Sequence, residues 1–301
     1  MNTLDALATN YHWVHGSMTK PFTSIITLYM SQQLALEPAV FEIVSVVNEV
    51  YYGGESDLDE YLRDIWSTII HISRKIPRES PGAPPDAPTA LQVRLVALLL
   101  ALKRQPDPKP VPQTHLQSPV NARRDLSWKQ LPLLERTINE ALDDEPGKRS
   151  KFTGVEAEGW VNFMAFVALI TKEKVVGLET VGIRMIRWAL EERHDSKALA
   201  SSRSRDVGKG DEATRLNVFV AAAAIWAVVM GEELWERMGE NTELQVGLSL
   251  DPAPQLPMGK IPKQRWEMWI DRLRFLSLCE DLKICTRELA AEAAAVMLRV
   301  L

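Results

Sequence analysis

The stretch that decides the fold runs from Val218 to Met230, VFVAAAAIWAVVM, thirteen residues without a polar side chain. A helix made from them is apolar on every side, so other helices must surround it. A membrane span needs roughly 20 apolar residues, and a run this short is typical of a buried core helix. A second stretch, Trp160 to Ile170 (WVNFMAFVALI), is interrupted only by Asn162. The sequence therefore predicts one or two fully apolar helices at the centre of the protein.

Helical periodicity continues through most of the chain. In residues 57–76, DLDEYLRDIWSTIIHISRKI, the apolar side chains follow three-and-four spacing, with acids in the first turn and Pro77 after the last. Similar patterns predict helices near 22–35, 38–51, 89–104, 130–143, 155–173, 178–194, 212–238, 262–278 and 281–300, and no convincing strand is found. We therefore expect an all-α fold, a single globular domain of about ten helices over residues 1–301.

Three segments break this pattern. Pro77 to Pro88 and Pro106 to Pro119 are rich in proline, which disfavours helix, so both are expected to be extended connectors. The third, Asp195 to Asp211, contains SSRSRDVGKG and is expected to be a mobile internal loop. The helices on both sides of each break have apolar faces to bury, so none of the three is predicted to divide the domain.

Composition excludes several classes of function. The net charge is -5, which gives no electrostatic reason to expect nucleic acid as a partner.

Cys279 and Cys285 are the only cysteines, and on one helix they would be too far apart for a disulfide. We expect both to pack as small hydrophobic residues in a reducing compartment. Because the N-terminus also lacks a signal-peptide pattern, the prediction is a cytoplasmic protein without a membrane span.

Motifs for cofactors and metals are missing from the sequence. It contains no glycine-rich phosphate loop, no nucleophile elbow and no zinc-ligand spacing. His12 and His15 have helical spacing for a metal, but no nearby carboxylate or cysteine completes a ligand set. No cofactor and no metal are predicted.

The candidate ligand-pocket residues are Trp160, Asn162, Trp226 and Glu233. Nine tryptophans are unusual, and an indole can both hold an apolar ligand and donate a hydrogen bond to it. Trp160 and Trp226 belong to the two apolar stretches, and Glu233 follows Trp226 on the same stripe of its helix. Each residue has a plainer explanation: core packing for the tryptophans, a backbone or water partner for the Asn162 amide, and a solvated helix end for Glu233.

Nine segments in order resemble a fungal family known as domain of unknown function 3632. They are YMSQQLALEPAVFEIV, DIWSTIIHISRKIPRESP, LVALLLALKRQP, WKQLPLL, GWVNFMAF, IRWALEE, AAAAIWAVVMGEELW, RWEMWIDRLRF and TRELAAEAAAVM. The resemblance implies a fungal source, an all-helical domain and no established catalytic residues. It also implies that some members are encoded among genes for natural-product biosynthesis, which favours small apolar substrates.

Two functions are compatible with these features. The first is a cofactor-independent cyclase, pericyclase or isomerase of secondary metabolism, which folds an apolar polyene or terpenoid in a pocket; its catalytic residues are unknown. The second is a non-catalytic helical protein that binds another protein or a small molecule. An enclosed cavity beside Val218 to Met230 favours the enzyme, whereas a filled core favours the binding protein. The substrate and the oligomeric state are not predicted.

Overall fold

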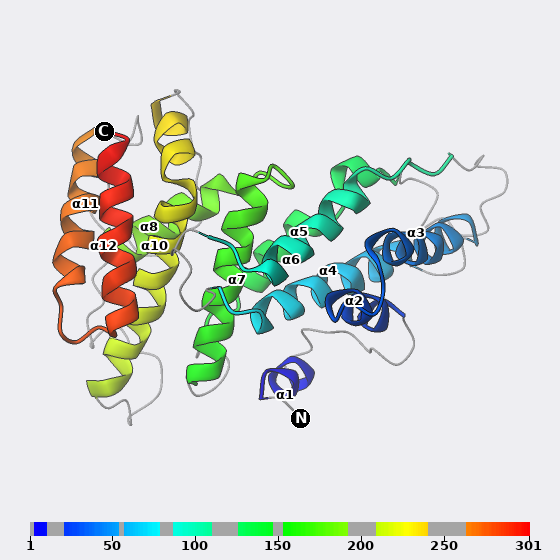
Figure 1. The fold of residues 1–301 in the computed structure, drawn as a ribbon, viewed down its shortest axis with the longest axis horizontal. Coiled ribbons are helices and arrows are strands. Elements are labelled where there is room, and N and C mark those ends of the chain that lie inside the picture. Colours follow the sequence, from blue (N-terminus) through cyan, green and yellow to red (C-terminus); the bar gives the residue numbers. More distant parts are fainter. Residues whose placement is uncertain are drawn as a thin grey trace. The chain divides into compact units, whose positions relative to one another are not determined.

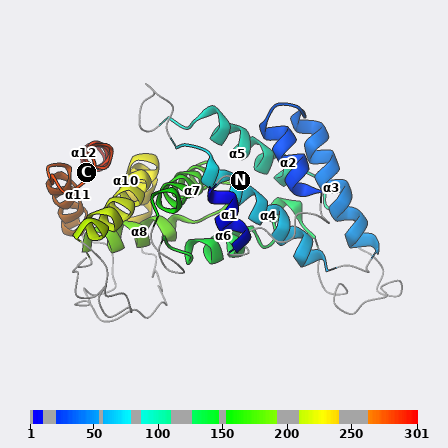
Figure 2. The same ribbon diagram turned by 90° about the horizontal axis from the view of Figure 1, so that it is seen from below.

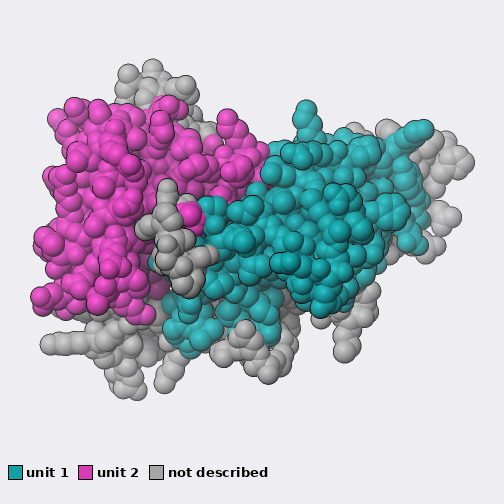
Figure 3. Space-filling model, viewed as in Figure 1, with its two compact units in different colours: residues 1–80, 88–166 teal, residues 81–87, 167–301 magenta. Residues whose placement is uncertain are grey.

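The computed structural model describes residues 3–10, 21–53, 57–78, 87–109, 126–146, 153–191, 209–239 and 263–301. These residues form helices and short turns, and no strand occurs among them, which confirms the all-α fold (Figure 1). The chain forms two compact units: residues 1–80 with 88–166, and residues 81–87 with 167–301 (Figure 3). Helix α7, Gly154–Lys172, contributes residues to both units. A single domain therefore stays a prediction.

The first unit is built on four mutually contacting helices, α2 (Phe22–Met30), α3 (Leu36–Gly53), α4 (Leu58–Lys75) and α5 (Ala90–Lys103). Helix α4 also contacts α6 (Leu134–Leu142), which follows the short 3-10 helix η2 (Trp128–Gln130). An N-terminal helix, α1 (Thr3–Asn10), was not predicted from the sequence. The core consists of apolar residues from the faces that these helices turn to one another, among them Phe22, Ile26, Ile43, Ile65, Ile69, Leu95 and Leu98.

The second unit surrounds the apolar run. Helix α10 (Lys209–Gly239) contacts α8 (Glu179–Glu191) and α12 (Ile284–Arg299), and α11 (Lys263–Ser277) contacts both α12 and α8 (Figure 2). From Val218 to Met230 every side chain is buried except the half-buried Val229. The run is therefore a core helix, as predicted.

Within α10, the segment Arg215–Glu236 is long and apolar enough to cross a membrane by length and composition. The 13-residue run alone is too short for this, but the helix extends beyond it. Of the most apolar 18-residue window in this segment, 78% is buried in the structure, as in a core helix.

Several segment boundaries differ from the prediction. Helix α2 was expected to continue to residue 35 but ends at Met30. The predicted loop at 195–211 lies outside the described residues, except that Lys209–Asp211 already belong to α10. The two proline-rich segments also lie largely outside the described residues.

The cysteines require a correction. Both are free, as predicted, but the chain turns between them, so Cys279 follows α11 and Cys285 lies in α12. Cys285 is exposed rather than packed in the core.

Candidate functional site

Trp226 lies in the core of the second unit. Its side chain has no exposed surface, and α8 approaches so closely that a Cβ atom on Gly182 would be 2.5 Å from Trp226 Cε3. Its indole Nε1 is buried as well, and no hydrogen-bond acceptor for it occurs among the described residues. A buried donor without an acceptor costs about 1–3 kcal/mol. Trp226 thus packs tightly through its ring, while its one polar atom is unused.

The Asn162 side chain hydrogen-bonds the backbone at the end of α4. Its Nδ2 donates to the Arg74 carbonyl at 3.2 Å, and its Oδ1 accepts from the Arg78 backbone N–H at 3.1 Å. Those two backbone groups are four residues apart and would bond to each other in a continuing helix. Because Pro77 interrupts α4, the Asn162 amide takes the place of that bond. The backbone partner considered from the sequence is therefore the one that the structure shows.

The four predicted pocket residues divide between the two units. Trp160 is fully buried and lies with Asn162 on the part of α7 that belongs to the first unit. Glu233 is half-buried and lies with Trp226 on α10 in the second unit. A pocket shared by all four stays a prediction. His12 and His15 lie outside the described residues.

Other tryptophans connect separate segments of the chain through their indole N–H groups. Trp66 Nε1 donates to the Pro132 carbonyl, Trp266 Nε1 to the Met297 carbonyl and Trp269 Nε1 to Glu191 Oε1. The last two join α11 to α12 and to α8. Much of the tryptophan excess therefore serves packing.

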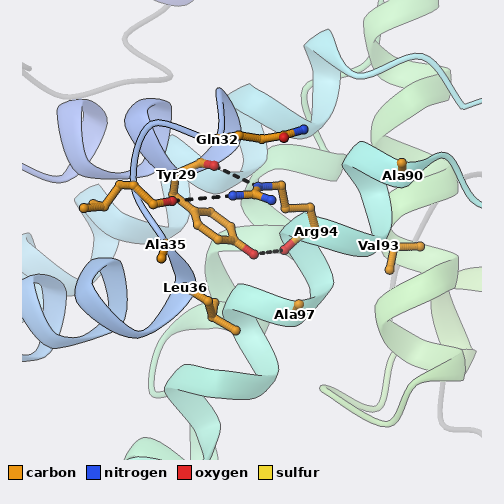
Figure 4. Close-up of a pocket in the computed structure, with 9 residues that line it drawn as sticks. Tyr29, Gln32, Ala35, Leu36, Ala90, Val93, Arg94 and Ala97 are labelled. Carbon is orange, nitrogen blue, oxygen red and sulfur yellow. Dashed lines mark hydrogen bonds between the residues drawn. The ribbon is translucent and has the colours of Figure 1, made fainter.

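An open groove lies on the first unit, between α5 and the turn that joins α2 to α3 (Figure 4). Its volume is about 580 Å³, within the usual range of ligand pockets, roughly 300–1,000 Å³. The lining residues are mostly small or apolar and include no tryptophan: Tyr29, Gln32, Leu34, Ala35, Leu36, Ala90, Val93, Arg94 and Ala97. None of them was predicted as a site residue.

Hydrogen bonds between Tyr29 and Arg94 link the two sides of the groove and fix the distance between them. The Tyr29 hydroxyl donates to the Arg94 carbonyl at 2.9 Å, and Arg94 Nε donates to the Tyr29 carbonyl at 2.8 Å. The guanidinium carbon also lies 4.3 Å from the centre of the Tyr29 ring, a cation–π contact. Nη2 of Arg94 reaches the Leu34 carbonyl at 3.5 Å, completing the set of bonds drawn in Figure 4. These bonds fix the groove in the absence of a ligand.

The turn at the end of α2 is a Schellman motif built without glycine. Gln33 N–H donates to the Leu28 carbonyl at 2.9 Å, and Gln32 N–H donates to the Tyr29 carbonyl at 3.1 Å. Gln32 has a φ of 65°, the left-handed conformation that this motif requires and that glycine adopts most readily. A glycine signal was absent from the sequence, which explains why the end of α2 was predicted five residues late.

The start of α5 sets the position of Arg94. Thr89 and Gln92 form a capping box, in which each side chain bonds the backbone N–H of the other. Ala90, Val93, Arg94 and Ala97 then fall on one face of the helix at helical spacing, opposite the buried leucines. One signal was present in the sequence: Arg94 is the only charged residue within ALQVRLVALLLA.

Electrostatics around the groove favour an anion at Arg94. The guanidinium is half-buried, and among the described residues no carboxylate lies within ion-pair distance of it. Burial raises the pKa of Tyr29; the Arg94 charge opposes that rise and the Glu37 charge adds to it. Glu37, whose charge acts on Tyr29, is an exposed residue in the first turn of α3.

Comparison with known proteins gives a family match. A family model described as "Protein of unknown function (DUF3632)" matches residues 66–273, well over half of the chain. The matched range includes both Arg94 and Trp226. No curated protein and no solved structure matches the chain.

Proposed function

We propose that this chain, which belongs to the DUF3632 family, is a helical binding protein that takes an apolar small molecule in the groove between α5 and the α2–α3 turn. The observation that carries the proposal is the pre-formed groove of about 580 Å³, held open by the reciprocal Tyr29–Arg94 hydrogen bonds. A site that is already formed loses little conformational freedom when it binds.

The lining residues support a small and mainly apolar ligand. Three alanines, Ala35, Ala90 and Ala97, leave the space that larger side chains would fill, and Val93 remains 50% exposed beside them. Covering such surface gains about 25 cal/mol per Å² of apolar area. A protein partner normally covers about 20–30 residues on each side, whereas nine residues line this groove.

The test is a panel of small apolar compounds added to the full chain and followed by amide chemical shifts. We expect binders to shift the signals of Tyr29, Val93 and Arg94. Replacing Ala97 with leucine fills the groove with a good helix former and should abolish those shifts. Shifts that survive Ala97→Leu, or that centre on α10, would count against this groove.

A second candidate is the cofactor-independent cyclase or isomerase acting on an apolar polyene or terpenoid. The observation in its favour is the buried Trp226 Nε1 without an acceptor among the described residues, because such a donor can polarise a carbonyl. Trp226→Phe removes the donor and keeps much of the ring. Turnover of a polyene substrate should then fall while substrate binding changes little, and unchanged turnover would remove this candidate.

A further inference from the structure

We infer that the ligand of the groove is an apolar monocarboxylate, a small acid whose carboxylate is bound end-on by Arg94. The inference rests on the proposed function, because it names a ligand class for the same groove. It starts from the hydrogen bonds that Arg94 makes and from those that it leaves unused.

One edge of the Arg94 guanidinium is occupied. Nε donates to the Tyr29 carbonyl at 2.8 Å and Nη2 to the Leu34 carbonyl at 3.5 Å, so this edge is bound to the end of α2 and the turn after it. A guanidinium has five N–H donors in a planar fork, and its far edge combines one proton of each Nη. Nη1 makes no hydrogen bond to any described residue. The far edge thus has the geometry that binds a carboxylate through two parallel bonds.

The position of Arg94 is also fixed before any ligand arrives. Two backbone carbonyls and the Tyr29 ring hold the guanidinium, so it does not lose further side-chain freedom on binding. Its charge is half-buried and unpaired, which makes an anion more favourable there than at an exposed lysine. The apolar walls at Val93 and Ala97 require the rest of the ligand to be apolar.

Glu37 opposes this binding from the first turn of α3. Glu37 directly follows Leu36, a lining residue of the groove, and its charge also acts on Tyr29, so it lowers the local preference for an anion. Removing the Glu37 charge should therefore strengthen the binding of a carboxylate and leave a neutral ligand unaffected. This prediction does not require any change to Arg94, whose loss would also release the α2–α3 turn.

The experiment compares decanoate with decanamide, a neutral molecule of the same shape, by calorimetric titration of the full chain at pH 7. Hydrogen bonds to a charged group are stronger than neutral ones, so decanoate should bind at least about 10-fold more tightly. Glu37→Gln should tighten decanoate by about 2-fold or more and leave decanamide unchanged.

A negative charge is introduced inside the groove in one variant and outside it in a matched control. Val93→Glu places a carboxylate beside Arg94 and should weaken decanoate by about 10-fold or more. Leu91→Glu makes the same change of charge on the same helix, at an exposed position that does not line the groove, and should have little effect.

The outcomes separate this inference from the proposed function. A preference for decanoate that Val93→Glu removes and Leu91→Glu preserves supports the inference. Equal binding of decanoate and decanamide, both lost in Ala97→Leu, overturns the carboxylate while the groove remains a binding site. Failure of both compounds to bind overturns the inference together with the proposed function. A peptide that ends in leucine with a free carboxylate is tested as well. If this peptide binds and decanoate does not, the ligand is a protein C-terminus and not a small acid.

Discussion

Gly182 tests how tightly the central helix is packed. An alanine there would place its Cβ 2.5 Å from Trp226 Cε3 and 2.8 Å from Trp226 Cδ2, whereas carbon atoms in contact are normally about 3.5–4.0 Å apart. The fully buried indole must then move by about 1 Å, and overpacking of this kind costs about 1–3 kcal/mol. Alanine gains back up to about 1 kcal/mol of helix propensity. We expect Gly182→Ala to lower the free energy of unfolding by about 1–2 kcal/mol.

The measurement is urea unfolding followed by circular dichroism, with Gly53→Ala as the control. Gly53 is also helical, and a Cβ there meets no atom of the described residues within 4 Å, so its substitution should be neutral or slightly stabilising. The diagnostic variant combines Gly182→Ala with Trp226→Phe, which removes Cε3 and Cζ3, two of the three indole atoms that the new methyl group would meet, and keeps a ring carbon near the position of Cδ2. In the Trp226→Phe background, Gly182→Ala should cost less than in the original protein, with a coupling energy of about 1 kcal/mol or more. The packing argument is refuted if Gly182→Ala behaves like Gly53→Ala in both backgrounds.

Three further predictions concern single residues. Gln32→Gly should raise the free energy of unfolding by about 0.5–1 kcal/mol, because glycine adopts the left-handed conformation without strain; a lower melting temperature would contradict this. Asn162→Leu should cost about 2–4 kcal/mol in urea unfolding, since it leaves the Arg74 carbonyl and the Arg78 N–H without the amide; a loss below 1 kcal/mol would contradict this. Burial lowers the pKa of His71 below 6.5, so the unfolded chain binds the proton first and stability should fall as the pH drops below about 6.5. His71→Gln should flatten that slope between pH 7.5 and 5.5, and an unchanged slope would assign it to other groups.

Local sequence signals predicted most of the helices. The expected helix at 57–76 is observed as Leu58–Lys75, because Asp57 caps its start and Pro77 ends it, and both signals act within a few residues. The apolar run likewise had one physical solution, burial among other helices. The end of α2 was missed because Gln32 occupies a position where the motif usually has glycine.

The groove could not be predicted in the same way. Its space arises where Ala35 on the α2–α3 turn faces Ala90 and Ala97 on α5, more than fifty residues later in the chain, and small residues carry no signal of what they face. Of the four pocket residues chosen from the sequence, Trp160 and Trp226 were chosen because they are large and aromatic. Trp226 instead packs against Gly182, and Asn162 bonds the end of α4, so the sequence identified buried residues correctly without showing which of them border a cavity.

The most direct test of the account is a crystal structure of the full chain with decanoate. We predict that the carboxylate lies within about 3 Å of both Nη atoms of Arg94, with the alkyl chain along Val93 and Ala97. An empty groove, with decanoate bound instead beside Trp226 on α10, would contradict the proposed site and favour a ligand pocket in the core.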